Sequence, residues 1–99
     1  MAHKKIDLNQ REIVGALRSH PGVSCFSIAS IGKGIPDLVV GAFGKTFLCE
    51  IKGPQGKLRP SQVEFQKSWR GGGIIVLRSI DEVEAFFKQV SRWSVEGGA

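Results

Sequence analysis

The stretch that decides the fold runs from residue 34 to 40, Gly-Ile-Pro-Asp-Leu-Val-Val, and resumes at residues 46–52, Thr-Phe-Leu-Cys-Glu-Ile-Lys. Each part is a short apolar run rich in β-forming residues, which is typical of a strand. The intervening Gly44-Lys45 predicts a turn that joins strands 37–42 and 46–52 into a β-hairpin.

Three charged residues interrupt this apolar hairpin. Side chains alternate along a strand, so Glu50 and Lys52 share one face, about 6–7 Å apart along the chain. Asp37 begins the neighbouring strand, and one pairing register brings it beside Glu50. The hairpin therefore predicts that two carboxylates and an ammonium converge.

Outward from the hairpin, the pattern predicts a single α/β domain over residues 1–99, with its core at about 9–92 and a frayed tail at 94–99. A helix over 9–19 has Asn9 as its cap, and a strand follows at 23–29. After the hairpin come a polar loop at 53–59, a helix from Pro60 to about Arg70, a strand at 74–77 and a last helix. The order α-β-β-β-α-β-α implies a mixed sheet flanked by helices.

Charge and composition indicate which classes of partner and which cell compartment to expect. The chain of 99 residues is 41% hydrophobic and 23% charged, which is ordinary for a globular protein, and its net charge of +5 favours a polyanionic partner. The longest apolar stretch is too short to span a membrane, and no signal peptide opens the chain, so we expect an intracellular protein. Cys25 and Cys49 lie in apolar runs and are expected to be small buried side chains.

Two carboxylates with nearby carbonyls form the hard-oxygen site that Mg²⁺ or Mn²⁺ prefers. The backbone carbonyl of Ile51 is a candidate further ligand. A metal held there polarises a phosphate and activates water, and Lys52 can orient that water or offset developing charge. The alternative is a solvated strand face with a weak ion pair and a turn aspartate at position 37. Charged groups that end the strand Phe-Leu-Cys-Glu-Ile-Lys are hard to explain by packing, and this favours the metal site.

The same residues resemble the PD-(D/E)xK nuclease superfamily, and more narrowly the small stand-alone virus-type replication-repair nuclease (VRR-NUC) family. The resemblance spans residues 32–78 through Gly-Ile-Pro-Asp-Leu (34–38), Cys-Glu-Ile-Lys-Gly-Pro (49–54), Gly-Lys-Leu-Arg-Pro-Ser-Gln (56–62) and Trp-Arg-Gly-Gly-Gly (69–73). It implies a restriction-endonuclease-like core, a divalent metal and hydrolysis of DNA by a homodimer acting on branched DNA. It also implies a bacterial or phage origin, and hence the cytoplasm of a bacterial or phage-infected cell. By this resemblance Asp37 and Glu50 hold metal, Lys52 is the catalytic lysine and Gln62 matches the glutamine of the following helix.

The first helix departs from this pattern. Related nucleases often place a metal-supporting glutamate where this sequence has Gln10, in Gln-Arg-Glu-Ile-Val. Gln10 shares a face with Ile13 and Val14, so it can reach a metal-bound water, whereas Glu12 points away and fits a capping box better. Loss of the glutamate charge at position 10 weakens a second metal position, so both one and two metal ions stay open.

Cations near the site predict how DNA is bound. Lys33 lies among glycines that permit close backbone approach, and Lys57 and Arg59 follow the strand that ends in Lys52. Solubility is the alternative role of each. Two other interpretations of the whole chain stay open: a non-catalytic DNA-binding accessory module with the same fold, and a basic protein-interaction domain that binds no metal. The natural DNA substrate and the cleavage polarity stay open as well.

Overall fold

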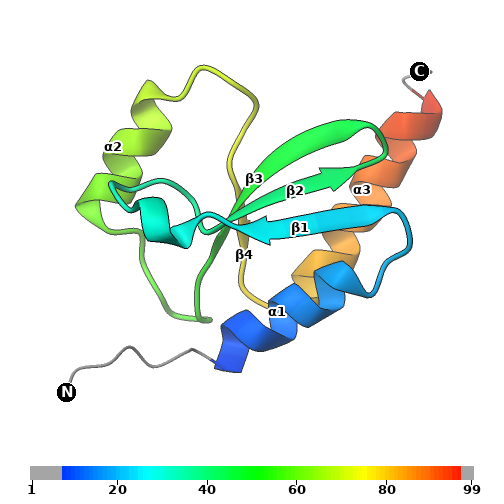
Figure 1. The fold of residues 1–99 in the computed structure, drawn as a ribbon, viewed down its shortest axis with the longest axis horizontal. Coiled ribbons are helices and arrows are strands. Elements are labelled where there is room, and N and C mark those ends of the chain that lie inside the picture. Colours follow the sequence, from blue (N-terminus) through cyan, green and yellow to red (C-terminus); the bar gives the residue numbers. More distant parts are fainter. Residues whose placement is uncertain (1–7, 97–99) are drawn as a thin grey trace.

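The computed structural model describes residues 8–96 of the chain (Figure 1). Along the sequence the elements are α1 (Leu8–Arg18), β1 (Val23–Ser27), the short 3₁₀ helix η1 (Ala29–Ile31), β2 (Leu38–Ala42), β3 (Lys45–Ile51), α2 (Pro60–Ser68), β4 (Ile75–Leu77) and α3 (Ile80–Glu96).

The four strands form one mixed sheet in the order β1-β2-β3-β4. The β1–β2 and β2–β3 pairs are antiparallel, whereas β4 runs parallel to β3 after the crossover through α2. The prediction of an α/β domain with a mixed sheet flanked by helices is therefore confirmed.

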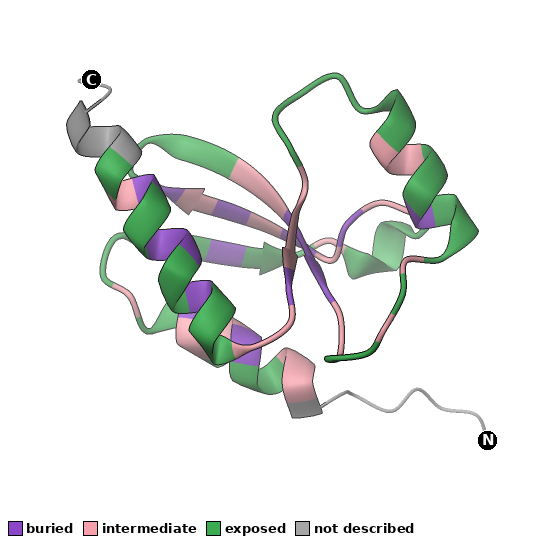
Figure 2. Ribbon diagram, turned by 180° about the vertical axis from the view of Figure 1, so that it is seen from behind, coloured by how far each residue is buried: buried purple, intermediate pink, exposed green. Residues whose placement is uncertain are grey.

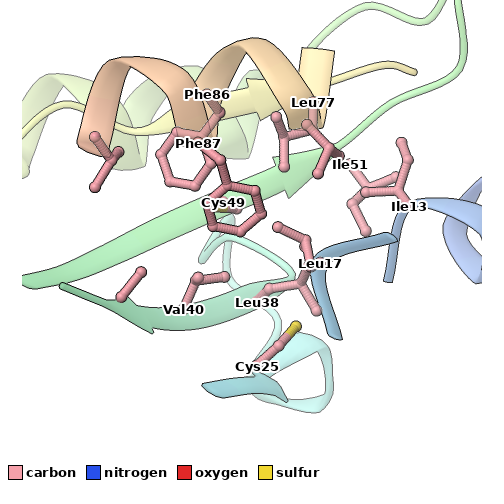
Figure 3. Close-up of a cluster of buried hydrophobic side chains, with 13 residues drawn as sticks. Ile13, Leu17, Cys25, Leu38, Val40, Cys49, Ile51, Leu77, Phe86 and Phe87 are labelled. Carbon is pink, nitrogen blue, oxygen red and sulfur yellow. The ribbon is translucent and has the colours of Figure 1, made fainter. Parts of the chain in front are cut away.

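The hydrophobic core lies on one face of this sheet, beneath α1 and α3 (Figures 1 and 2). Ile13 and Leu17 of α1 are fully buried, as the helical spacing predicts. In Figure 3 the rings of Phe86 and Phe87 from α3 lie against the same cluster. The strands contribute alternate residues, which is the pattern of a sheet with one covered face, and these residues are Cys25, Leu38, Val40, Ala42, Cys49, Ile51 and Leu77.

The helix α2 does not join this layer. Figure 1 shows α2 and η1 together at the end of the sheet where β2 begins and β3 ends. Only Gln62 of α2 is buried. The helix therefore closes one end of the sheet and does not build the core.

Several element ends differ from the sequence-based prediction. Strand β1 stops at Ser27 because the chain turns into η1, where the Ile31 N–H bonds to the Ile28 carbonyl. Helix α2 ends at Ser68, since Trp69 adopts an extended conformation. Helix α3 continues to Glu96, because no helix breaker precedes the glycines at 97 and 98. Fraying of the tail from residue 94 stays a prediction. Residues 97–99 lie outside the described part of the chain.

The hairpin turn also lies one residue earlier than predicted. Phe43 and Gly44 both have positive φ, 55° and 76°, as two-residue turns of type I′ require. Glycine adopts this conformation readily, whereas Phe43 adopts it at a steric cost.

Both cysteines are buried and free, as predicted. Burial, reinforced by the neighbouring Cys25, raises the pKa of Cys49 to about 12, so this thiol stays protonated and unreactive. Within residues 8–96, no helix has the length and apolar character needed to cross a bilayer.

Candidate functional site

The β2–β3 register places Asp37 opposite Glu50. Leu38 pairs with Cys49, and continuing this antiparallel register by one position brings Asp37 and Glu50 together. Their side chains point away from the face covered by α1 and α3, because the neighbouring Leu38 and Cys49 point into the core. The Ile51 N–H donates to Oδ2 of Asp37 at 2.8 Å, which fixes this carboxylate at the end of β3.

Glu50 is held from two sides and is only 2% exposed. Nε2 of Gln62 donates to Oε2 of Glu50 at 2.9 Å, and Nζ of Lys52 lies 4.0 Å from the same oxygen. Oε1 of Gln62 in turn accepts the Arg59 N–H at 2.7 Å, so this side chain connects the start of α2 to Glu50. The Lys52 side chain is 12% exposed, which leaves its ammonium largely desolvated beside the carboxylates.

The negative charges of Asp37 and Glu50 repel each other, and this affects the pKa of Glu50. Burial, then the charge of Asp37 and a hydrogen bond with it, raise the pKa of Glu50 to about 7, against the opposing effect of Lys52 and Arg59. At neutral pH the site thus retains a proton for part of the time. A cation held between the carboxylates would replace that proton.

A polar cavity of about 180 Å³ opens over these groups. It is lined by the glycine-rich loop, the strand ends and the start of α2, and the lining includes Asp37, Glu50, Lys52 and Gln62. Lys33 and Arg59, both expected to bind DNA, line it too. Lys57 is exposed on the loop between β3 and α2, outside this lining.

Other predicted residues lie apart from the cavity. Gln10 is half-buried on α1 but lines a different hollow with Arg18, Ser27 and Leu38, so the expected reach toward the site is not seen. Glu12 is exposed.

The predicted cap at Asn9 is wrong, because α1 already begins at Leu8. The Ile51 N–H donates a hydrogen bond to Asp37, while metal binding by the Ile51 carbonyl stays a prediction.

The donor set fits a small hard cation. Within residues 8–96 no three His, Cys, Asp or Glu side chains come close enough to hold a metal together, so Asp37 and Glu50 are the carboxylates available. Mg²⁺ is often held by one or two carboxylates, with water and substrate oxygens completing its shell. The raised pKa of Glu50 supports this fit, because the paired acids lack a nearby charge that fully balances them.

Two residues outside the sequence-based site support it from behind. Nδ2 of Asn9 donates to the carbonyls of Lys52 and Arg78, at 2.8 and 3.3 Å. Nη1 of Arg78 donates to the carbonyls of Gly53 and Gly56, both at 2.7 Å. Its place after β4, which runs parallel to β3, makes Arg78 the neighbour of Lys52, but no sequence pattern marks the carbonyls that it contacts.

The glycine-rich loop touches α2 at one point. Gly34 has a φ of 81°, and a Cβ on it would lie 2.1 Å from the Ser61 carbonyl oxygen. This close approach holds the loop that carries Lys33 against the start of α2. Only glycine adopts this positive φ readily and also lacks the Cβ that would clash with Ser61.

Gly34→Ala is therefore expected to lower the free energy of unfolding by at least about 3 kcal/mol, through backbone strain together with the clash. Gly32→Ala is the matched control, because Gly32 has a φ of 72° but nothing within 4 Å of an added Cβ. That variant should cost only about 1–3 kcal/mol from strain alone. Urea unfolding of both measures the difference, and equal losses would show that the contact with Ser61 contributes nothing.

Comparison with protein-family models and with curated proteins finds no match to this chain. The functional assignment therefore depends on the chemistry of the site and on the sequence motifs.

Proposed function

We propose that this chain is a Mg²⁺- or Mn²⁺-dependent DNA endonuclease with a restriction-endonuclease-like core, of the VRR-NUC type that its motifs resemble. The observation that carries the proposal is the pairing of Asp37 with the buried Glu50, with Lys52 beside them in a polar cavity. Two carboxylates alone would repel a phosphodiester, whereas two carboxylates that hold a metal would attract it.

Each residue has a distinct part in this scheme. Asp37 and Glu50 would hold the metal, which when bound polarises the scissile phosphate and makes water a better nucleophile. The ammonium of Lys52 is placed to orient the attacking water or to balance the negative charge that grows on the phosphate. Gln62 holds the Glu50 carboxylate in one orientation through its amide N–H.

Positive charge around the cavity supports a nucleic-acid substrate. Lys33 and Arg59 line the cavity and Lys57 is exposed beside it, so all three can contact phosphates on either side of the cut. The net charge of +5 acts in the same direction. We further propose a homodimer whose two sites face opposite strands of branched DNA, in the cytoplasm of a bacterial or phage-infected cell.

One observation favours a second candidate, the DNA-binding accessory module without catalysis. Gln10 stands where related nucleases carry a glutamate, and it lines a different hollow from the paired carboxylates. The site then has two carboxylates in place of three, which weakens metal binding. The buried Glu50 opposes this candidate, because such a group costs stability and has no use in a module that only binds DNA.

The deciding experiment is cleavage of a labelled four-way junction and a matched linear duplex with Mg²⁺, Mn²⁺ or EDTA. We expect cutting with either metal and none with EDTA. Asp37→Asn should lower the rate at least about 100-fold, since it removes a metal ligand. Asp81→Asn, on the exposed first turn of α3, is the matched control and should cut like the wild type.

The pattern of products decides between the candidates. Preferred cutting of the junction supports the branched substrate, while equal cutting of both supports a general nuclease. If the wild type binds both DNAs and cuts neither with any metal, the endonuclease is wrong and the accessory module takes its place.

A further inference from the structure

The loop between β3 and α2, residues 53–59, has no regular secondary structure but is tied down at one point. Nη1 of Arg78 donates to the carbonyls of Gly53 and Gly56, each at 2.7 Å. The Gly56 N–H bonds back to the Gly53 carbonyl at 3.1 Å, which closes a turn under the guanidinium. Hydrogen bonds from a charged donor are roughly twice as strong as neutral ones, so a single side chain sets the shape of this turn.

This turn follows the candidate catalytic lysine directly in the chain. A Cβ on Gly56 would lie 3.3 Å from the Gly53 nitrogen and in ordinary van der Waals contact with Cβ of Lys52, at 3.6 Å, so Gly56 folds back beside Lys52. Because Arg78 holds the Gly53 carbonyl, the turn restrains the backbone from which the Lys52 side chain leaves the strand.

Arg78 reaches this turn because of the sheet topology. Ile51 pairs with Leu77 in the parallel β3–β4 ladder, and the Lys52 N–H bonds to the Leu77 carbonyl, so Arg78 follows as the neighbour of Lys52. Asn9 then joins the two strand ends by donating to the carbonyls of Lys52 and Arg78. The carbonyl of Lys52 is thus held by α1, and its N–H is held by β4.

We propose that Arg78 is a positioning residue, which acts through the 53–56 turn to orient Lys52. The inference rests on the proposed endonuclease function for its effect on catalysis. Arg78 is half-buried, and its Nη1 donates to two backbone carbonyls inside the protein.

The test compares Arg78→Met and Arg78→Lys with Arg92→Met, in which an exposed arginine of α3 is removed. Arg78→Met should lower kcat about 10- to 100-fold at saturating DNA, since misplacing a catalytic group by about 1 Å has this order of effect. KM should stay within about 3-fold, and Arg78→Lys should restore part of kcat by keeping a charged donor. Arg92→Met should match the wild type.

Two further readouts separate positioning from other roles. Hydrogen exchange of the amides in the 53–58 loop should speed up at least about 10-fold in Arg78→Met and stay unchanged in Arg92→Met. The salt dependence of DNA binding in EDTA should be unaltered, whereas loss of a phosphate contact lowers its slope by about one unit. Wild-type kcat in Arg78→Met, or a lowered salt slope with normal kcat, overturns the proposal.

Failure of the proposed function has a different signature. If the wild type cuts no DNA with any metal, the endonuclease is wrong, and hydrogen exchange alone then decides whether Arg78 holds the turn. Faster exchange confined to the 53–58 loop supports the positioning role, and wild-type exchange in both Arg78 variants overturns it.

Discussion

Glu50→Gln is expected to make the metal-free protein more stable at pH 8 while it abolishes DNA cleavage. Burial and the adjacent Asp37 raise the pKa of Glu50 from 4.5 to about 7, so the folded state holds this proton more tightly than the unfolded state does. The stability that this proton contributes is present below pH 4.5 and is lost as the pH rises through about 7. Glutamine keeps the bond from Gln62 and never ionises, so it avoids that loss.

The expected gain is about 3 kcal/mol at pH 8 in EDTA, taking about 1.4 kcal/mol for each unit of the pKa shift. At pH 4 the gain should vanish, because wild-type Glu50 is then protonated in both states. Urea unfolding at the two pH values measures this difference. Glu64→Gln is the control, since Glu64 is 75% exposed on α2 and should show no such pH dependence.

The same variant should lose activity, because it removes one of two carboxylates that would hold the metal. We expect the Mg²⁺-dependent cleavage rate to fall at least about 100-fold. Adding Mg²⁺ at pH 8 should raise the Tm of the wild type and leave that of Glu50→Gln unchanged, since binding stabilises only the form that binds. A variant that is stabilised and still cuts DNA would contradict the role of Glu50 as a ligand.

The pairing of Asp37 with Glu50 could be predicted because strands obey a simple geometry. Side-chain alternation puts Glu50 and Lys52 on one face, and a two-residue turn leaves little freedom in the register of a hairpin. The one-residue error in the turn did not change the predicted strand pairing, since Phe43-Gly44 still connects the same two strands. The buried residues of the strands follow the same alternation, and those of α1 and α3 follow the helical spacing.

The support around the site could not be predicted in this way. Arg78 and Asn9 act on backbone carbonyls, and such contacts depend on how loops fold and leave no periodic trace in the sequence. The placement of Gln10 depended on the rotation of α1 about its axis, and a turn of a few tens of degrees decides which hollow a half-buried side chain enters. Helical spacing identifies the apolar face of a helix but not the neighbour of each polar residue at its edge.

The second large effect is expected for Lys52→Met, which removes the ammonium and keeps a side chain of similar length. Nζ of Lys52 lies 4.0 Å from Oε2 of Glu50 and is well shielded from water, so its charge acts strongly on anything bound in the cavity. Loss of a preorganised donor that stabilises transition-state charge lowers kcat by about 100- to 1,000-fold. We expect this fall in single-turnover cleavage by Lys52→Met, and wild-type rates for Lys88→Met, which alters an exposed lysine on α3.

Metal binding, in contrast to cleavage, should not be weakened in Lys52→Met. The ammonium of Lys52 repels a dication, and its removal should leave the affinity for Mn²⁺ unchanged or tighter when measured by titration calorimetry. Lost cleavage with retained Mn²⁺ binding therefore assigns Lys52 to the chemical step, because a ligand-holding residue would lose both together. Cleavage by Lys52→Met within about 3-fold of the wild type would remove this lysine from the mechanism, since that ratio is well under 1 kcal/mol of transition-state stabilisation.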